Sequence, residues 1–177
     1  MIDVDSSQQR IFLEPLTIGD LDRVMQIDRA SYSAPWKQTT YRTELRNRSA
    51  TYLVARMSGD VVGYAGIWNI MDEAHITTIA VDQAYRRRHI GERLLVAILE
   101  EAVLKGAHYV TLEVRESNIP ARALYEKYGF KVVAIRRNYY TDNNESALVM
   151  WAEDTDAEKY RHFLKTARQT LECEQIL

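Results

Sequence analysis

The chain has a single cysteine, Cys173, among its 177 residues, which excludes an intramolecular disulfide and fits a reducing compartment. It also lacks a charge excess, since 23 lysines and arginines stand against 25 aspartates and glutamates. Nothing in that balance indicates nucleic-acid or membrane binding. No apolar run approaches the roughly 20 residues of a membrane span, and residues 1–9 lack the basic and apolar regions of a signal peptide. We therefore expect a soluble, cytoplasmic protein.

The sequence does contain a regular succession of short apolar segments, enough for one well-buried domain and too little for two. Alternation and turn residues predict strands at 10–16, 51–56, 61–67, 75–81, 109–114, 130–136 and 146–151. Helix-start signals and helical spacing predict a helix from Thr17, a short one through Tyr41 and Leu45, and two more at 91–106 and 118–128.

The last part of the chain stands apart from this succession. Its large apolar residues recur at helical spacing and predict one amphipathic helix: Tyr160, Phe163, Leu164, Ala167 and Leu171. That helix packs either on the flank of its own sheet, which is the simpler expectation, or on a second copy, so the oligomeric state stays open. We expect a flexible tail at residues 1–9, one domain at 10–153 and a helical extension at 154–177.

A basic turn, Arg86-Arg87-Arg88-His89-Ile90-Gly91, joins the strand that ends at Val81 to an apolar helix. The first turn of a helix offers four N–H groups without an intrahelical partner and a partial positive charge, which suit a diphosphate. Taken alone, the arginines indicate only a solvated basic turn. The strand before the turn and the helix after it favour phosphate binding. A G-x-G-x-x-G turn and a G-K-[ST] phosphate loop are both absent.

A second group of residues surrounds the strand at 109–114. Glu113 alternates with the apolar residues of that strand, where a lone carboxylate is ordinarily a surface residue. Asn118 is suited to cap the next helix, with Pro120 in its first turn. Tyr125 lies seven residues after Asn118 and therefore on the same helical face, about two turns away. This spacing directs Glu113, Asn118 and Tyr125 to one cleft and favours catalysis over a core role for Tyr125.

These segments resemble the core of the GNAT family of N-acetyltransferases. The ending Tyr125-Glu126-Lys127-Tyr128-Gly129-Phe130 is similar to the close of the family's core. The continuation Arg136-Arg137-Asn138-Tyr139-Tyr140 resembles the RimI-type ribosomal-protein alanine N-acetyltransferases. The resemblance covers nearly all of residues 11–151. It implies an α/β (α+β) fold, with a mixed, mostly antiparallel sheet that is flanked by helices and splayed open between the strands ending at Val81 and Val114.

The resemblance also implies roles for particular residues. Glu113 would be the general base, Tyr125 the general acid, and Asn118 would help to hold acetyl-CoA. The co-substrate's pantetheine arm would meet the main chain of Ile79, Ala80 and Val81, and its diphosphate the turn of Arg87, Arg88, His89, Ile90, Gly91 and Glu92. The acceptor groove would be bordered by loops that carry Trp36, Tyr139 and Tyr140. No residues have zinc-ligand spacing, so no metal is expected.

Two positions depart from the family's pattern. His89 stands where the family has its first glycine in the diphosphate turn, and a positive φ there would strain a residue with a Cβ. We read this as a reduced fit or an added imidazole–phosphate contact. Glu145-Ser146-Ala147 stands where relatives commonly carry Glu-Asp-Ala, and the missing carboxylate bears on substrate preference more than on chemistry.

The reaction implied is direct transfer of an acetyl group from acetyl-CoA to an amine, with the alanine-type N-terminus of a ribosomal protein as acceptor and partner. An α-amino group titrates near 7.7–8.0 and a lysine near 10.4, so a carboxylate base has the lighter task with an N-terminal amine. Two alternatives stay open. The acceptor is another amine, such as a lysine side chain, a polyamine or an aminoglycoside, or the chain senses acetyl-CoA without turnover.

Overall fold

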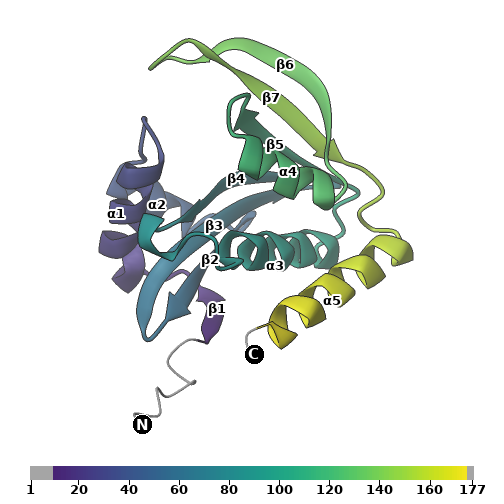
Figure 1. The fold of residues 1–177 in the computed structure, drawn as a ribbon, viewed down its shortest axis with the longest axis horizontal. Coiled ribbons are helices and arrows are strands. Elements are labelled where there is room, and N and C mark those ends of the chain that lie inside the picture. Colours follow the sequence, from purple (N-terminus) through teal and green to yellow (C-terminus); the bar gives the residue numbers. More distant parts are fainter. Residues whose placement is uncertain (1–9, 175–177) are drawn as a thin grey trace.

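The computed structural model describes residues 10–174, and Figure 1 shows a sheet flanked by helices. The strands are β1 (Ile11–Pro15), β2 (Ala50–Met57), β3 (Asp60–Ile70), β4 (Glu73–Val81), β5 (Tyr109–Arg115), β6 (Lys131–Tyr140) and β7 (Glu145–Ala152). The helices are α1 (Leu21–Ser31), α2 (Gln38–Glu44), α3 (Ile90–Leu104), α4 (Ile119–Lys127) and α5 (Glu158–Cys173). The expected tail at residues 1–9 lies outside the described residues. Within 10–174 no helix is both long and apolar enough to cross a membrane.

The sheet runs in the order β1-β2-β3-β4-β5-β7-β6, and β4–β5 is the one parallel pair among neighbouring strands of the described chain. These two strands pair over only three positions, from Glu73 with Tyr109 to His75 with Thr111. Beyond that point β4 continues to Val81 and β5 to Arg115 without pairing to each other. We call the space between them the β4–β5 opening. The predicted fold, a mostly antiparallel sheet splayed at this place, is confirmed.

Two apolar clusters cover opposite faces of the sheet. Neighbouring residues of β2 show this, because successive side chains of a strand point to opposite faces. Val54 packs with α1 and Tyr41 of α2, whereas Ala55 packs in the cluster that contains Leu95 of α3. Burying each large side chain of these clusters contributes about 1.5–3 kcal/mol relative to leaving it in water. The central strands that border the opening therefore lie between two packed apolar layers.

The terminal helix α5 packs on α3 of its own chain, as Figure 1 shows for the yellow helix beside α3. Leu164 and Leu171 are almost completely buried in the cluster formed with α3, and the Tyr160 hydroxyl donates to the Tyr128 carbonyl at 2.9 Å. The predicted burial of the apolar stripe is confirmed for these residues. Phe163 is covered only in part: its side chain is 38% exposed, although its ring centroid lies 5.5 Å from that of Tyr128.

One expectation about local structure is wrong. Tyr139 and Tyr140 do not lie in a loop, because β6 continues to Tyr140 instead of ending near Arg136. The strand passes an irregularity in which Asn138 has a φ of 54°, and Tyr140 then pairs with Glu145 of β7. A non-glycine residue in the left-handed region is uncommon, and asparagine is among the residues that adopt it most readily. The two tyrosines are therefore the last two residues of β6, in the β6–β7 hairpin.

Candidate active site

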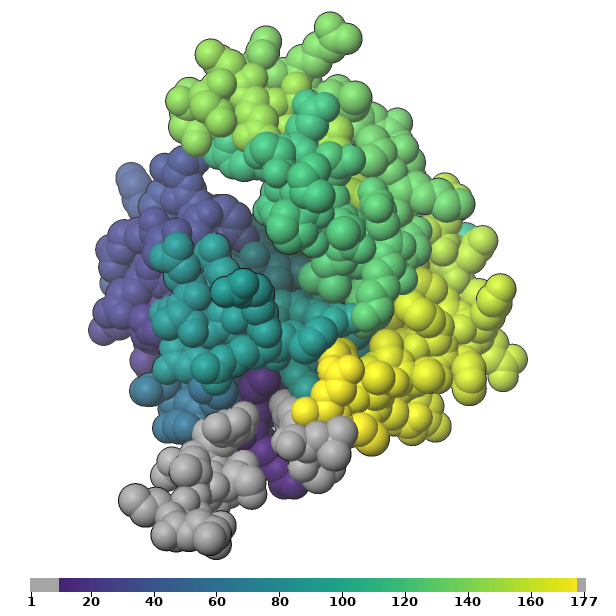
Figure 2. Space-filling view, in the orientation of Figure 1, coloured from purple at the N-terminus to yellow at the C-terminus, as the bar shows by residue number. Residues whose placement is uncertain are grey.

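Residues from separate parts of the chain border the β4–β5 opening. Glu113 lies on β5 two residues beyond the last paired position, Thr111, and Ile79–Val81 form the end of β4. The helix α4 follows the end of β5. Figure 2 shows a gap beneath the tip of the β6–β7 hairpin, between the purple-blue segment of α1 and α2 and the green surface around α4. The opening is therefore accessible from outside.

An imidazole and a guanidinium hold Glu113. Its side chain is only 15% exposed, its Oε2 lies 3.2 Å from His75 Nε2, and its Oε1 lies 2.9 Å from Arg136 Nη1. The hydrogen bond with His75 lowers the pKa of the Glu113 carboxyl, burial opposes this, and the charge of Arg136 adds to the lowering. Glu113 is therefore ionised at neutral pH and is able to accept a proton.

The sequence did not identify His75 or Arg136 as partners of Glu113. His75 reaches the carboxylate because it pairs with Thr111 across the parallel β4–β5 contact. Arg136 reaches it because β7 lies between β5 and β6, with Glu113 opposite Val149 and Arg136 opposite Ala147. Both contacts depend on strand register, which no local pattern of residue types reveals.

Three phenols share the opening with Glu113. Tyr125 of α4 is half-buried, with its ring 5.8 Å from that of Phe130, and burial raises the pKa of its phenol, as do nearby Tyr32 and Tyr140. Burial is the main cause that raises the pKa of Tyr140 to about 12, with Arg115 opposing the rise and the Tyr139, Glu113 and Tyr32 groups adding to it. Such phenols stay protonated at neutral pH and are therefore able to donate a proton. The structure thus brings Tyr125 and Tyr140 to one place.

Tyr32, at the end of α1, is a residue that the sequence did not single out. Its hydroxyl donates to the Ile79 carbonyl at 2.8 Å and accepts from the Ile79 N–H at 3.2 Å and from the Thr78 hydroxyl at 3.1 Å. The main chain of Ile79 therefore points into the opening, as expected for a group that holds an extended ligand arm. The same contacts show that the Tyr32 hydroxyl occupies both the N–H and the carbonyl of Ile79.

The basic turn has the geometry expected of a phosphate site. Arg87 and His89 have φ values of 62° and 56°, and His89 is the N-cap of α3. The first intrahelical bond runs from Arg93 N to His89 O, so the N–H groups of Ile90, Gly91 and Glu92 precede the helical ladder. Successive N–H groups in such a conformation, with the positive end of a helix, form an anion-binding concavity. This confirms the positive φ considered for His89.

Side chains around the turn are partly committed to other contacts. Glu92 is 8% exposed and accepts from Lys127 Nζ at 2.5 Å, from the Tyr128 hydroxyl at 2.8 Å and from His89 Nδ1 at 2.9 Å. Burial raises the pKa of its carboxyl, but these hydrogen bonds outweigh burial and the net pKa is lowered. Glu92 can therefore serve a phosphate through its main-chain N–H alone. The His89 and Glu92 side chains also line a cavity of about 250 Å³ against α5.

The remaining expected cofactor residues lie near the same end of the sheet. Asn118 is the N-cap of α4, and its Oδ1 accepts from Ala121 N at 3.3 Å, as the spacing predicted. Ala80 is buried, while the Val81 carbonyl accepts from Arg86 Nε at 3.3 Å. Arg88 lies with its guanidinium carbon 5.8 Å from the ring of Tyr85.

Trp36 lies in the segment between α1 and α2, and Tyr139 lies near the end of β6. The main-chain N–H of Trp36 donates to the buried Asp28 carboxylate at 2.7 Å. The centroid of the Trp36 ring lies 5.4 Å from that of Tyr41. Trp36 also lines a small cavity of about 80 Å³ together with Tyr32 and Thr78. Tyr139 is 45% exposed, and its ring lies 5.2 Å from that of Tyr140. Trp36 is therefore both a core residue and a pocket wall.

Comparison with known proteins fits this geometry. The model of the acetyltransferase (GNAT) family matches residues 21–130. A protein of Bacillus subtilis named as a putative [ribosomal protein bS18]-alanine N-acetyltransferase is 44% identical over 137 residues, which are 77% of this chain and 91% of that protein. The Escherichia coli K12 protein named [ribosomal protein bS18]-alanine N-acetyltransferase is 34% identical over 140 residues, 78% of this chain and 94% of that protein.

A solved structure extends the likeness to three dimensions. The crystal structure of the ribosomal-protein-S18-alanine N-acetyltransferase from Escherichia coli superposes with a TM-score of 0.77 at 32% identity, over 85% of this chain and 97% of that one. The chain belongs to the GNAT acetyltransferase family and is an N-acetyltransferase. Within that family its closely similar relatives are of the RimI type, as the residues around Glu113 and Tyr139 indicated.

The family uses acetyl-CoA as its co-substrate, and the described residues fit that molecule. The N–H groups at the start of α3 suit the diphosphate, and the main chain of Ile79 faces the opening where an extended arm would lie. Within residues 10–174 no group of three or more metal-binding side chains lies together.

Proposed function

We propose that this enzyme acetylates the N-terminal amine of a ribosomal protein, of the alanine type, with acetyl-CoA as donor. The names of its RimI-type relatives supply the acceptor class, and the likeness spans more than nine tenths of each relative. The observation that carries the chemistry is Glu113, an ionised and mostly buried carboxylate beside protonated phenols in the β4–β5 opening. This is the pairing of proton acceptor and proton donor that acyl transfer to an amine needs.

In the proposed reaction the neutral amine attacks the thioester carbonyl carbon, and the C–N bond forms. The nitrogen becomes positively charged in the adduct and gives a proton to Glu113, directly or through one water. The C–S bond then breaks, and Tyr125 donates its proton to the leaving sulfur, so that free thiol and an amide result. A thiol has a free pKa near 8.5 and a phenol near 10, and burial raises the pKa of Tyr125 further, so Tyr125 is protonated at neutral pH and can donate as charge develops on the leaving sulfur.

Co-substrate and acceptor would enter the opening from different sides. The main chain of Ile79, Ala80 and Val81 would hold the pantetheine arm, with the diphosphate at the turn of Arg87 to Glu92 and Asn118 nearby. Trp36, Tyr139 and Tyr140 would line the acceptor's path. A phenol such as Tyr140 offers both a donor and an acceptor to a peptide main chain.

An acceptor screen tests the proposal. Purified enzyme is given acetyl-CoA and one of three acceptors: a peptide with a free N-terminal alanine, the same peptide with a blocked N-terminus and an internal lysine, or a polyamine. We expect thiol release and a single added acetyl group with the first peptide, mapped to its N-terminus by fragmentation mass spectrometry. Acetylation of the lysine or polyamine in preference to the free N-terminus would overturn the acceptor assignment.

The cellular consequence has its own test. Intact-mass analysis should compare ribosomal proteins from cells with and without this enzyme. One of them should be lighter by about 42 Da in cells that lack the enzyme, the mass that one acetyl group adds by its chemical formula. We propose a cytoplasmic location with no nucleic acid or membrane as partner, in line with the nearly balanced charge of the chain. Unchanged masses of all ribosomal proteins would contradict the proposed partner.

A further inference from the structure

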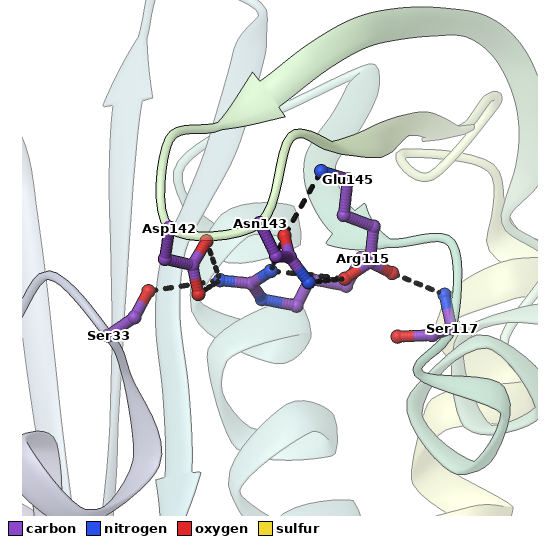
Figure 3. A network of polar contacts seen from close by, with 6 residues as sticks. All are labelled: Ser33, Arg115, Ser117, Asp142, Asn143 and Glu145. Carbon is purple, nitrogen blue, oxygen red and sulfur yellow. Dashed lines mark hydrogen bonds and ion pairs between the residues drawn. The ribbon is translucent and has the colours of Figure 1, made fainter.

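Arg115, the last residue of β5, is the centre of a polar cluster that the reaction does not use. Figure 3 shows its guanidinium among side chains from three other segments. Its Nη2 donates to both oxygens of Asp142, at 2.9 and 2.8 Å, and to the Ser33 hydroxyl at 3.0 Å. Its Nη1 donates to Glu145 Oε2 at 3.0 Å and to Asn143 Oδ1 at 3.2 Å. We call this group, with Ser117, the Arg115 cluster.

The cluster joins the two walls of the acceptor's path. Ser33 belongs to the α1–α2 segment that also carries Tyr32 and Trp36, and Asp142 belongs to the turn at the tip of the β6–β7 hairpin. In Figure 2 this tip lies above the gap, and the α1–α2 segment lies beside it. The Arg115 guanidinium thus links the α1–α2 segment to the hairpin tip.

The same guanidinium also positions a phenol. The Arg115 carbon Cζ lies 3.8 Å from the ring centroid of Tyr140, within the range of a cation–π contact. Arg115 therefore fixes the ring of a residue that borders the opening while its nitrogens hold the surrounding loops. A lysine could not replace it, because only the planar guanidinium donates in several directions while stacking on a ring.

The anionic partners of Arg115 stay charged over the working range. Hydrogen bonds from Ser117 lower the pKa of Glu145 to about 2, and the contact with Arg115 lowers that of Asp142. Glu145 also accepts from Ser117 N at 2.7 Å, just before α4, so the cluster reaches the helix that carries Tyr125. The α1–α2 segment and the hairpin tip are thus linked to Arg115 directly, and the start of α4 is linked to it through Glu145.

The hairpin is also held by main-chain pairing. Its β6–β7 register runs from Lys131 opposite Trp151 to Tyr140 opposite Glu145, and β7 pairs with β5 as far as Arg115 opposite Ala147. What the cluster adds is the placement of the tip against the α1–α2 segment. The contacts of the Arg115 cluster therefore act on the geometry of the gap more than on the fold of the hairpin.

We propose that Arg115 is a positioning residue for the acceptor, which sets the distance between the β6–β7 tip and the α1–α2 segment and orients Tyr140. The inference rests on the proposed function, because it concerns the path of the acceptor amine. The class of acceptor that fits a path bridged in this way is an extended chain end that inserts beneath the hairpin tip, not a folded surface.

The first test compares Arg115→Met and Arg115→Lys with Arg56→Met as control. Arg56 is matched in kind, since its side chain is 25% exposed against 24% for Arg115 and it too contacts two carboxylates, Glu14 and Asp20, far from the opening. We expect both Arg115 variants to raise KM for the N-terminal peptide about 10-fold or more, since small misplacements of a bound reactant are costly. The Kd for acetyl-CoA should stay within twofold, and the control should keep wild-type KM.

A purely structural role would give a different pattern. The melting temperature would fall, and acetyl-CoA binding and peptide KM would worsen together, in Arg115 and Arg56 variants alike. Ser33→Ala separates the two readings, because it removes only the link to the α1–α2 segment. It should raise peptide KM with no change in melting temperature, and an unchanged KM in both Ser33→Ala and Arg115→Lys would overturn the proposal.

A second measurement does not depend on turnover. Spin labels at Ala34→Cys and Thr141→Cys, in a Cys173→Ser background, report the distance across the gap. We expect one narrow distribution in the parent and a broader or longer one with Arg115→Met. If the distribution is unchanged, the positioning role is wrong even where N-terminal acetylation is found. If it broadens while no peptide is acetylated, the positioning role stands and the proposed acceptor fails.

Discussion

His75 Nε2 lies 3.2 Å from Glu113 Oε2, so an imidazole on β4 contacts the proposed catalytic base on β5 just where the two strands part. This contact is the main reason why the pKa of Glu113 is lowered although its side chain is mostly buried. Burial alone would raise the pKa of a carboxyl and so favour its protonated form. His75 thus keeps Glu113 in the form that accepts a proton, at the cost of making it a weaker base.

The proposed base is tested with Glu113→Gln. The amide keeps the shape of the side chain but cannot take the proton, so turnover should fall about 10²–10⁴-fold, the usual contribution of a general base. Binding of acetyl-CoA, measured by calorimetry, should persist because the diphosphate turn is untouched. Glu158→Gln, on the exposed side of α5, is the matched control and should keep wild-type turnover. Full activity of Glu113→Gln would remove the carboxylate from the mechanism.

The proposed acid is tested with Tyr125→Phe. The phenol is protonated at neutral pH because burial raises its pKa, and without it the thiolate must leave unaided. Turnover measured by thiol release should fall about 10²–10⁴-fold. A donor with a better leaving group, such as an acetyl thioester of an aromatic thiol, should recover part of the loss. Equal losses with both donors would show that Tyr125 acts through packing against Phe130 and not as an acid.

The His75 contact predicts how stability depends on pH. Glu113 has a lower pKa folded than unfolded, so its contribution is present above the unfolded value, near 4.5, and is lost as pH falls through the folded value. In His75→Asn the folded pKa of Glu113 should rise toward the unfolded one, so the stability lost on going to acid pH should be smaller than in the parent. Urea unfolding between pH 3 and 7 measures this. Parallel curves for the variant and the parent would contradict a linkage between the two residues.

The left-handed backbone of His89 predicts the effect of a glycine there. His89→Gly should bind acetyl-CoA as well as the parent or better, because the phosphate donors are main-chain N–H groups and glycine adopts a φ of 56° without strain. Glu92 keeps its contacts with Lys127 and Tyr128. Calorimetry with CoA provides the measurement. A large loss of affinity would show that the imidazole itself binds phosphate.

Local patterns predicted one part of the site and missed another for a physical reason. Asn118 and Tyr125 were predictable because helix capping and helical period act over a few residues. Glu113 was predicted together with them because its strand leads directly into that helix. His75, Arg136 and Tyr32 were missed because their contacts depend on strand register and on how α1 meets β4, which involve residues tens of positions apart. Tyr139 and Tyr140 were assigned to a loop because nothing local indicates that β6 resumes after Asn138.

Tyr32 gives the last prediction. Its hydroxyl satisfies both the N–H and the carbonyl of Ile79, the main-chain groups that we expect to hold the pantetheine arm. Acetyl-CoA must then displace the phenol before it can bond to Ile79, and each net hydrogen bond is worth about 0.5–1.5 kcal/mol.

Tyr32→Phe removes this competition and should lower the Kd for acetyl-CoA about 2- to 10-fold, the equivalent of about one such bond. The aromatic ring remains, so its packing should be preserved and the melting temperature should change little. Tyr41→Phe is a suitable control, since its buried hydroxyl bonds Tyr64 at 3.0 Å and does not contact Ile79. Weaker binding of acetyl-CoA by Tyr32→Phe alone would show the opposite role, with the phenol turning from Ile79 to the bound co-substrate and helping to hold it.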